Sequence, residues 1–317
     1  MDLYSSPECP QPKGATVGQI TTFDGMRLRY ARWSTTAKRG KGTVCVFPGR
    51  GEFIEKYYEV VSELRERGFA VAVLDWRGQG GSDRALKNPR ISHVDDFEDY
   101  ERDLRRYMEE IVLPDCPAPY YALAHSMGGN ILLRAARLGD CWFDRMVLVS
   151  PMVKIIQGIR FPALTKKLAE ALAFLGLGSH FVPGGSDKPM ECQPFPGNLL
   201  TSDEVRLDRM CSIVEAVPHL ALGSPSIQWL YAAFQTTTEI ADPDFPETVK
   251  VPMLLFGAGD DKIVSVKAIE QLCAEMRVGS FMLLPSARHE ILMEQDYIRE
   301  QFWAAFDAFI PGSPVYL

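Results

Sequence analysis

Short apolar runs alternate with longer segments in which apolar residues recur at helical spacing, from residue 42 to about residue 309. The runs are unbroken and rich in Val, Leu and Ala, which is typical of strands buried on both faces of a parallel sheet. The sequence predicts strands of this kind at 43–48, 69–75, 120–125, 146–150, 252–257 and 280–284. It predicts helices at 53–67, 94–112, 127–138 and 295–309.

The segment before the first of these strands follows a different pattern. Residues 19–33 alternate apolar and polar positions and contain the turn pair Asp24-Gly25, which predicts an antiparallel hairpin at one edge of the sheet. Together these elements indicate an α/β protein with a mostly parallel, eight-stranded sheet and helices on both faces.

The regular order of strands and helices stops between residues 151 and 228. Clusters of Pro and Gly at 182–185 and 194–197 interrupt this part, and helices are predicted around 164–175 and 203–216. We interpret residues 151–228 as a helical lid inserted into an α/β core made of residues 1–150 and 229–317. Without the insertion, the core falls within the roughly 250–300 residues at which single hydrophobic cores stop growing.

The composition narrows the classes of partner and location. Hydrophobic residues make up 46% and charged residues 24%, which excludes global disorder. A net charge of −7 argues against nucleic acid as the main partner, because neutralising phosphates requires clustered cations. The start lacks the basic and apolar regions of a signal peptide, and the uncharged apolar stretch 171–186 is too short and too rich in Gly to span a bilayer. The sequence therefore predicts a cytoplasmic protein.

The cysteines and histidines do not predict a metal site or a disulfide framework. The seven cysteines are scattered and form no C-x-x-C pair, and the five histidines lack metal-ligand spacing. The cysteines are Cys9, Cys45, Cys116, Cys141, Cys192, Cys211 and Cys273. No cofactor or metal is predicted.

The strongest chemical signal is the segment Ala124-His125-Ser126-Met127-Gly128-Gly129, which lies between a predicted strand and a predicted helix. It has the G-x-S-x-G pattern of a nucleophilic serine on a sharp turn, with Ala124 in the place of the first glycine. The helix that begins at Met127 directs its free N–H groups and positive dipole end toward the serine, which favours a developing oxyanion. The alternative is a serine that only caps the helix.

A nucleophilic serine requires a base and a carboxylate that orients the base, usually in the chain order Ser, Asp/Glu, His. His289 lies in a loop after the last strand, where its imidazole can return over the carboxyl edge of the sheet. Asp260 and Asp261 follow the strand at 252–257, and either carboxylate could hold the histidine.

Further segments occur in a set order along the chain: Phe47-Pro48-Gly49-Arg50-Gly51-Glu52, 74–82, 93–100 with Asp103, 261–264 and 287–290. With the serine motif, they resemble α/β-hydrolase-fold serine hydrolases of the monoacylglycerol lipase and lysophospholipase type, in the serine aminopeptidase S33-like (Hydrolase_4) group. The resemblance covers about residues 20–310 and favours Asp261 over Asp260. It implies a catalytic triad of Ser126, Asp261 and His289.

The resemblance also implies an oxyanion hole made by the backbone N–H groups of Arg50 and Met127. Pro48 departs from the family pattern, which has a histidine beneath this turn, so the support of the turn is in question. A dinucleotide-binding fingerprint at 49–54 is a weaker alternative, because Ile54 occupies the position of the third glycine.

The function expected from these residues is ester hydrolysis through an acyl-enzyme, with a lysophospholipid or monoacylglycerol as the lipid substrate. The alternatives are a small-substrate esterase, a thioesterase or an aminopeptidase, and, from another class, a non-catalytic binding protein on the same fold. The apolar residues of the lid either line an acyl-chain site or touch a membrane surface transiently, or else pack the lid onto the core. These residues are Phe161, Leu164, Leu168, Leu172, Phe174, Leu175, Leu177 and Phe181.

Overall fold

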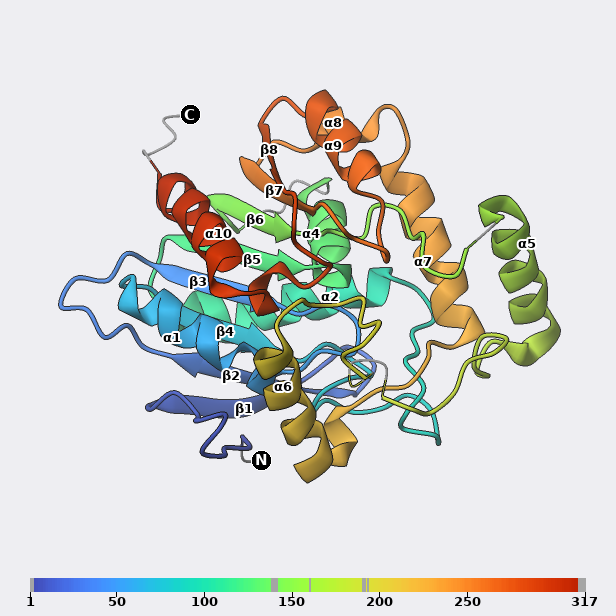
Figure 1. Cartoon of the computed structure of the whole chain (residues 1–317), viewed down its shortest axis with the longest axis horizontal. Helices are drawn as coiled ribbons and strands as arrows, with labels where there is room; N and C mark the ends of the chain where they lie inside the picture. Colours follow the sequence, from blue (N-terminus) through green and yellow to red (C-terminus); the bar gives the residue numbers. More distant parts are fainter. Residues whose placement is uncertain (1–2, 138–141, 160, 190–191, 193, 313–317) are drawn as a thin grey trace.

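The computed structural model describes residues 3–137, 142–159, 161–189, 192 and 194–312 (Figure 1). Leu138, the predicted end of a helix, and Cys141 lie outside the described residues. Eight strands form one sheet in the order β1-β2-β4-β3-β5-β6-β7-β8. Their bounds are β1 Ala15–Thr21, β2 Arg27–Trp33, β3 Thr43–Phe47, β4 Ala70–Leu74, β5 Tyr120–His125, β6 Arg145–Val149, β7 Met253–Ala258 and β8 Gly279–Leu284.

The two N-terminal strands are antiparallel and the remainder of the sheet is parallel. β1 pairs with β2 in a hairpin, and β2 pairs antiparallel with β4. All pairings from β4 to β8 are parallel. The predictions of an edge hairpin and a mostly parallel eight-stranded sheet are confirmed.

Alternate residues of each central strand enter opposite hydrophobic cores. In β5, Tyr121 and Leu123 face one core, whereas Ala122 and Ala124 face the other. Both sets are buried because side chains alternate across a sheet and helices cover both faces. This double burial explains why the strands appear in the sequence as unbroken apolar runs.

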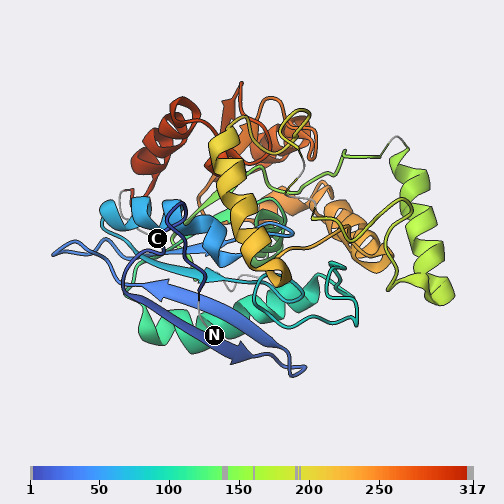
Figure 2. The ribbon, with the colours of Figure 1, turned by 60° about the horizontal axis from the view of Figure 1, so that its bottom comes forward.

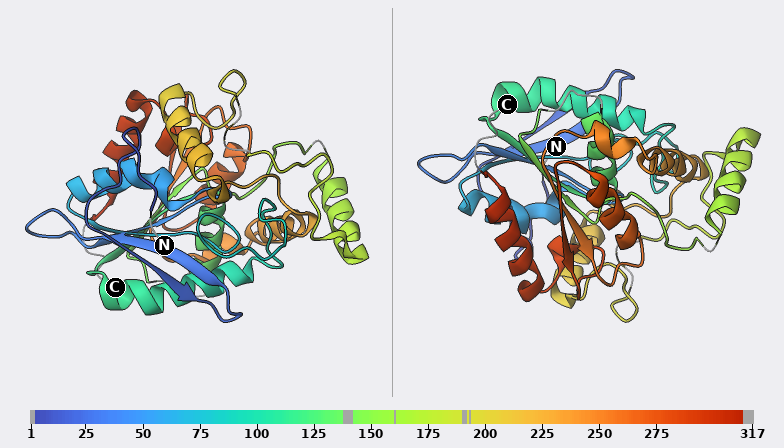
Figure 3. Two further views of the ribbon diagram at one scale, coloured as in Figure 1. Left: turned by 90° about the horizontal axis from the view of Figure 1, so that it is seen from below. Right: turned by 90° about the horizontal axis from the view of Figure 1, so that it is seen from above.

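Longer helices form the two outer layers (Figure 3). Residues of α1, α6 and α10 pack in one core, and residues of α2, α4, α7 and α9 pack in the other. The α-helices are α1 Tyr58–Glu66, α2 Glu98–Tyr107, α3 Leu113–Asp115, α4 Met127–Arg137, α5 Pro162–Leu172, α6 Glu204–Ala216, α7 Ile227–Ile240, α8 Phe245–Thr248, α9 Val266–Glu275 and α10 Asp296–Phe309. The short 3-10 and π segments are Ile54–Tyr57, Met108–Val112, Ala173–Leu177, Pro218–Leu220 and Ile291–Met293.

One predicted helix begins later than its sequence pattern indicates. The segment 94–112 is helical only from Glu98, and it continues from α2 into a π-helical turn. The Asp96 side chain accepts a hydrogen bond from the Glu98 backbone N–H at 2.8 Å. Asp96 therefore supports the loop before the helix, where a short acidic side chain competes with helical backbone bonding.

The two longer helices of residues 151–228 have opposite environments (Figure 2). Helix α6 buries Leu207, Met210 and Ile213 in the same core as α1 and α10. Helix α5 stands apart from the sheet and packs on α7, and of its residues only Ala169 is buried. Of the alternatives for the apolar residues of this region, packing onto the core is therefore excluded for most of them. The exposed ones are Phe161, Leu164, Leu168, Phe174, Leu175 and Leu177.

Within the part of the chain that the structure describes, no helix combines the length and apolar character required to cross a membrane.

The burial of two leucines in parallel strands predicts different losses of stability when each is replaced by alanine. Leu148 in β6 is fully buried, whereas Leu283 in β8 is 45% exposed. Leu148→Ala should lower the free energy of unfolding by about 2–5 kcal/mol, because it removes buried methyl groups and leaves a cavity. Leu283→Ala should lower it by about 0.5 kcal/mol or less, since its side chain is half in solvent. Urea unfolding followed by circular dichroism measures both, and equal losses would contradict the assigned burial.

Candidate active site

Ser126 lies on a strained turn between β5 and α4. Its φ of 49° falls in the left-handed region, which a non-glycine residue rarely adopts. Backbone hydrogen bonds fix the turn: the Ser126 N–H donates to the Val149 carbonyl at 3.0 Å, and the Ser126 carbonyl accepts from Met152 at 2.9 Å. Strain of this kind persists only where the surroundings determine it. Here the end of β6 holds the turn.

The turn requires a residue without a side chain at position 128. A Cβ on Gly128 would lie 2.4 Å from the Phe47 carbonyl oxygen, which is backbone and cannot move away cheaply. Gly128 thus lets α4 begin against the end of β3, and this contact brings Ser126 beside the turn that follows β3. The alanine at position 124 is the strand partner of Phe47, and its methyl group is buried in the hydrophobic core on one face of the sheet.

The structure brings three of the predicted side chains together. The Ser126 hydroxyl oxygen lies 3.0 Å from His289 Nε2, and His289 Nδ1 lies 2.8 Å from Asp261 Oδ2. All three residues are buried. Asp260 instead pairs at 2.7 Å with Lys262 in solvent, so Asp261 is the carboxylate that contacts the imidazole.

Two loops join the acid to the imidazole. The Gly259 N–H donates to the Leu284 carbonyl at 2.8 Å, and the Asp260 N–H donates to the Ala287 carbonyl at 2.9 Å. A Cβ on Gly259 would lie 2.2 Å from the Pro285 carbonyl oxygen, so this close approach also requires glycine. The loops after β7 and β8 are therefore held together as one surface.

Asp261 is held in its ionised form. Burial by itself would raise the pKa of Asp261, but the neighbouring His289 and the N–H groups of Ile263 and Val264 together hold the pKa below its ordinary value. Those two amides donate to Asp261 Oδ1 at 2.8 and 3.0 Å. The other carboxylate oxygen is left for His289, which fixes the orientation of the imidazole.

The turn after β3 is held from inside the protein. The Glu52 carboxylate accepts a hydrogen bond from the Gly49 N–H. The Gln79 side chain accepts from the Gly51 N–H at 3.2 Å and donates to the Gly49 carbonyl at 2.7 Å. The carbonyl of Pro48 accepts from the Trp76 indole at 2.9 Å. The support that a histidine would give at position 48 therefore comes from Glu52, Gln79 and Trp76.

The predicted oxyanion residues lie on either side of this junction. Arg50 belongs to the turn that Glu52 and Gln79 hold. Met127 is the first residue of α4, so no carbonyl within the helix accepts its N–H. Gly128 and Phe47 bring these two backbone segments into contact.

Sequence reasoning missed the side chains behind the imidazole. The ring of His125 lies 4.8 Å from that of His289, centroid to centroid, and its nitrogens face Glu52 Oε1 at 2.8 Å and the His289 carbonyl oxygen at 3.2 Å. Lys56 and Glu290 extend this group of buried charges. The i,i+4 spacing of Glu52 and Lys56 and the pair His289-Glu290 were available signals, but neither indicated burial.

The remaining histidines have other surroundings. His93 Nδ1 lies 2.8 Å from the Ser226 hydroxyl oxygen, at the junction with α7. His180 and His219 are exposed residues of the segment 151–228.

The chemistry available near Ser126 is a hydroxyl beside an imidazole that a buried carboxylate orients. This arrangement can activate a nucleophile.

Comparison with known proteins places the chain among hydrolases. The family model described as serine aminopeptidase, S33 (Hydrolase_4) matches residues 38–296. Lysophospholipase L2 of Escherichia coli K12 is 30% identical over 294 residues, covering 89% of this chain and 83% of that protein. Monoglyceride lipase of Rattus norvegicus is 30% identical over 134 residues, which is 42% of each chain.

A solved structure has the same fold. A soluble variant of monoglyceride lipase from Saccharomyces cerevisiae, in complex with a substrate analogue, superposes with a TM-score of 0.74 at 20% sequence identity. The match covers 94% of this chain and 96% of that one. The sheet order, the strained serine turn and this superposition agree on the α/β-hydrolase fold.

The two neighbouring aspartates provide a matched test of the acid. Asp261→Asn should slow the labelling of Ser126 by a fluorophosphonate by up to about 10⁴-fold, the loss seen when an orienting aspartate becomes an amide in a serine protease. Asp260→Asn should change the rate by less than about 2-fold, since its carboxylate pairs with Lys262 in solvent. Labelling rates measured by mass spectrometry decide between them, and the reverse order would reject Asp261 as the orienting group.

Proposed function

The chain belongs to the serine aminopeptidase S33 family of α/β hydrolases, and on this premise we propose that it hydrolyses the acyl ester of a lysophospholipid through an acyl-enzyme on Ser126. The observation that carries the reaction type is the buried line of contacts from the Ser126 hydroxyl through His289 to Asp261, at 3.0 and 2.8 Å. These are hydrogen-bonding distances for a nucleophile, its general base and the group that orients the base.

The reaction follows from those contacts. His289 Nε2 takes the Ser126 proton while the hydroxyl oxygen bonds to the ester carbon, and Asp261 stabilises the imidazolium. The negative charge on the carbonyl oxygen is bound by the backbone N–H groups of Arg50 and Met127, each worth about 2.7–4 kcal/mol in comparable sites. The bond to the alcohol breaks and the alcohol takes the proton from His289. A water molecule then attacks the acyl-enzyme while His289 takes its proton. The ester bond to Ser126 breaks, the serine oxygen takes the proton back from His289, and the fatty acid is released.

We choose a lysophospholipid as the substrate because of the share of each relative's length that is similar to this chain. The similarity to lysophospholipase L2 extends over 83% of that protein, whereas the similarity to the rat monoglyceride lipase extends over 42% of it. The shared length with lysophospholipase L2 therefore includes parts of the chain beyond the serine motif. Monoacylglycerol is the second lipid to test.

We propose that residues 151–228 form a lid over a core of residues 1–150 and 229–317. Short bridges support this division, because they join the segment to the core near both of its ends: Ile155 with Val264, and Pro225 with Ser92. Within the described part of the segment, most of the exposed large apolar side chains lie around α5, whereas α6 buries Leu207, Met210 and Ile213 in the layer over α1. We therefore restrict the lipid-facing part of the lid to the region of α5.

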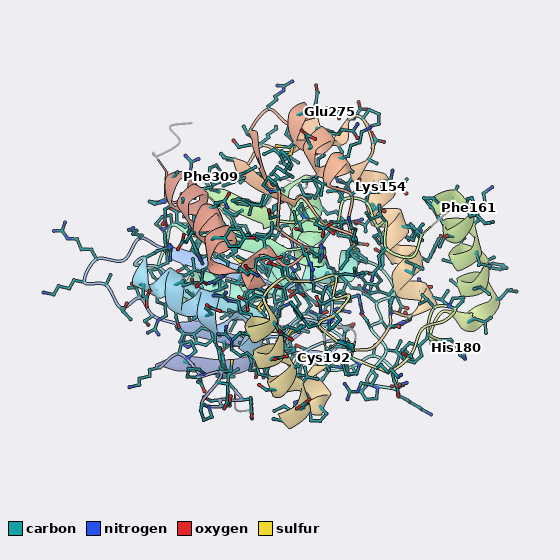
Figure 4. The ribbon with its side chains drawn as sticks, viewed as in Figure 1. Lys154, Phe161, His180, Cys192, Glu275 and Phe309 are labelled. Carbon is teal, nitrogen blue, oxygen red and sulfur yellow. The ribbon has the colours of Figure 1, made fainter. Side chains whose placement is uncertain are left out.

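We propose that the exposed face of α5 touches a lipid surface. In the π-helical turn Ala173–Leu177 that continues α5, Phe174 is 91% exposed and Leu175 is 70% exposed, and Phe161 directly precedes the other end of the helix (Figure 4). Exposed apolar side chains of this size gain free energy on entering a bilayer interface. The contact makes the protein peripheral at a membrane, and the cytoplasmic location stays a prediction.

A cavity of about 540 Å³ between α5, α7 and α9 is our candidate site for the acyl chain. Its apolar lining includes Val153, Phe234 and Leu272, and Lys154 and Glu275, labelled in Figure 4, also line it. Val153 directly follows Met152, whose N–H donates to the Ser126 carbonyl. The wall of the cavity at Val153 therefore lies one residue from the backbone that contacts the serine turn.

Ser126→Ala should abolish both turnover and fluorophosphonate labelling, because it removes the nucleophile and leaves the fold unchanged. Turnover is measured on a panel of palmitoyl lysophosphatidylethanolamine, monopalmitoylglycerol, p-nitrophenyl acetate, an acyl thioester and a peptide amide. We expect the highest kcat/KM on the lysophospholipid. A preference for the acetate, the thioester or the amide would select a different hydrolase. Full labelling of the alanine variant would reject Ser126.

If α5 contacts lipid, variants of its exposed apolar residues should bind vesicles more weakly without a change in the rate of ester hydrolysis in solution. The double variant Phe174→Ser with Leu175→Ser should bind vesicles of phosphatidylethanolamine and phosphatidylglycerol at least about 10-fold more weakly, since each side chain contributes of order 1.5–3 kcal/mol when fully buried. Its kcat/KM on p-nitrophenyl acetate should be unchanged. Val205→Ser is the control, because Val205 is an equally exposed apolar residue on α6, at 75%. Equal losses in the two proteins would contradict a contact through α5.

A further inference from the structure

Four buried charged side chains lie together behind the serine turn: Glu52, Lys56, His125 and Glu290. Lys56 Nζ lies 2.7 Å from Glu52 Oε1 and 2.7 Å from Glu290 Oε1. His125 Nδ1 lies 2.8 Å from Glu52 Oε1. We refer to these four residues as the ionic network.

The ionic network reaches two parts of the proposed active site. Through Glu52 it accepts the hydrogen bond of the Gly49 N–H, in the turn that carries Arg50. Through His125 Nε2 it meets the backbone carbonyl of His289 at 3.2 Å. One group of charges therefore joins the turn after β3 to the loop that carries the imidazole.

The contacts of His125 indicate that its ring is an imidazolium. Both of its nitrogens face acceptors, a carboxylate and a carbonyl, and only the cation has an N–H for each of them. Burial opposes this charge, but the charge of Glu52, its hydrogen bond and the charge of Glu290 outweigh burial and raise the pKa of His125 above 6.5. The same contacts with His125 and Lys56 hold the pKa of Glu52 well below its ordinary value, against the effect of burial.

We propose that the ionic network positions the reacting groups: Glu52 holds the oxyanion turn, and cationic His125 holds the His289 backbone, so that imidazole and oxyanion donors keep a fixed separation. This inference rests on the proposed function, since it assigns a task to residues around the Ser126 centre. Glu52 acts through Gly49 and His125 acts through the His289 backbone, so both are positioning residues, and Lys56 and Glu290 act through their charges on these two.

The charges of the ionic network balance only while His125 is protonated. The Nδ1 proton is held by the Glu52 carboxylate, so the proton lost at high pH is the one on Nε2. The lone pair of Nε2 then faces the His289 carbonyl oxygen and repels it. Since a misplacement of about 1 Å can cost about 100-fold in rate, kcat should fall as His125 deprotonates.

Two single variants should shift the pH at which His125 loses its proton in opposite directions. The groups that face His125 are Glu52 and Lys56 from the segment after β3, Glu290 and the His289 ring from the loop after β8, and the Tyr57 hydroxyl, which donates to Glu52 Oε2 at 2.5 Å. Glu290→Gln removes a charge that favours the imidazolium, so the pKa of His125 should fall. Lys56→Met removes a charge that opposes it, so the pKa should rise. The double variant should return toward the parent protein.

The first measurement follows the His125 ring by NMR across pH in the parent protein and in both single variants, with His125→Gln to assign its signal. The parent ring should titrate above pH 6.5, at lower pH in Glu290→Gln and at higher pH in Lys56→Met. A parent ring that titrates at or below pH 6.5 would overturn the inference, and this result requires no variant other than the one used for assignment.

The second measurement is the pH profile of kcat on the preferred ester. Its alkaline limb should follow the His125 titration in the parent protein and in both single variants, and Glu52→Gln should lower kcat between about 10-fold and 100-fold with little change in KM. Asp103→Asn is the matched control, because Asp103 is a fully buried carboxylate paired with Arg77 at 2.6 Å and stands apart from this network. It should lose stability while its alkaline limb stays in place.

The outcomes separate this inference from the proposed function. If Ser126→Ala is still labelled, the proposed function fails. If Ser126 is essential but both single variants shift the alkaline limb in the same direction, or neither shifts it, the positioning role alone is overturned.

Discussion

The close packing of the β5–α4 turn against the end of β3 is the constraint on which the rest of the site depends. Because Gly128 has no side chain, α4 begins in contact with the Phe47 carbonyl, and Ser126 adopts its left-handed backbone conformation beside the turn that carries Arg50. Several charged side chains near this contact are buried, among them Glu52, His125 and Asp261. Buried charges require partners, which explains why Glu52, His125 and Asp261 all have short hydrogen bonds to ionic or backbone groups.

Most of the fold could be predicted because its strands are buried on both faces. Such strands are continuous apolar runs, and β5 was predicted with its observed bounds. The start of α2 was misplaced, because the hydrogen bond of Asp96 to the Glu98 N–H is a local choice that the helical spacing of apolar residues does not encode. The positions of Ser126, His289 and Asp261 followed from motif and chain order. Asp260 and Asp261 could not be separated from their own residues, since only the loop conformation directs one carboxylate inward and the other into solvent.

The ionic network could not be predicted, because its members come from three separate segments and charged residues are rarely buried. The environment of the lid helices could not be predicted for the opposite reason. Leucines at helical spacing predict a buried face, and α6 follows that rule while α5 does not. The difference is one of surroundings: Arg206 of α6 pairs with Glu59 of α1 at 2.6 Å, whereas α5 is held to α7 through contacts such as Lys166 with Thr238.

The order of the elements along the chain has a consequence for how such an enzyme can diversify. Ser126 lies before residue 151 in the chain. Asp261 and His289 lie in the loops after β7 and β8, and backbone hydrogen bonds join these two loops. The segment between β6 and α7 supplies none of these three side chains. Evolution can therefore lengthen, shorten or replace that segment and acquire new substrates, while the reacting groups are inherited unchanged.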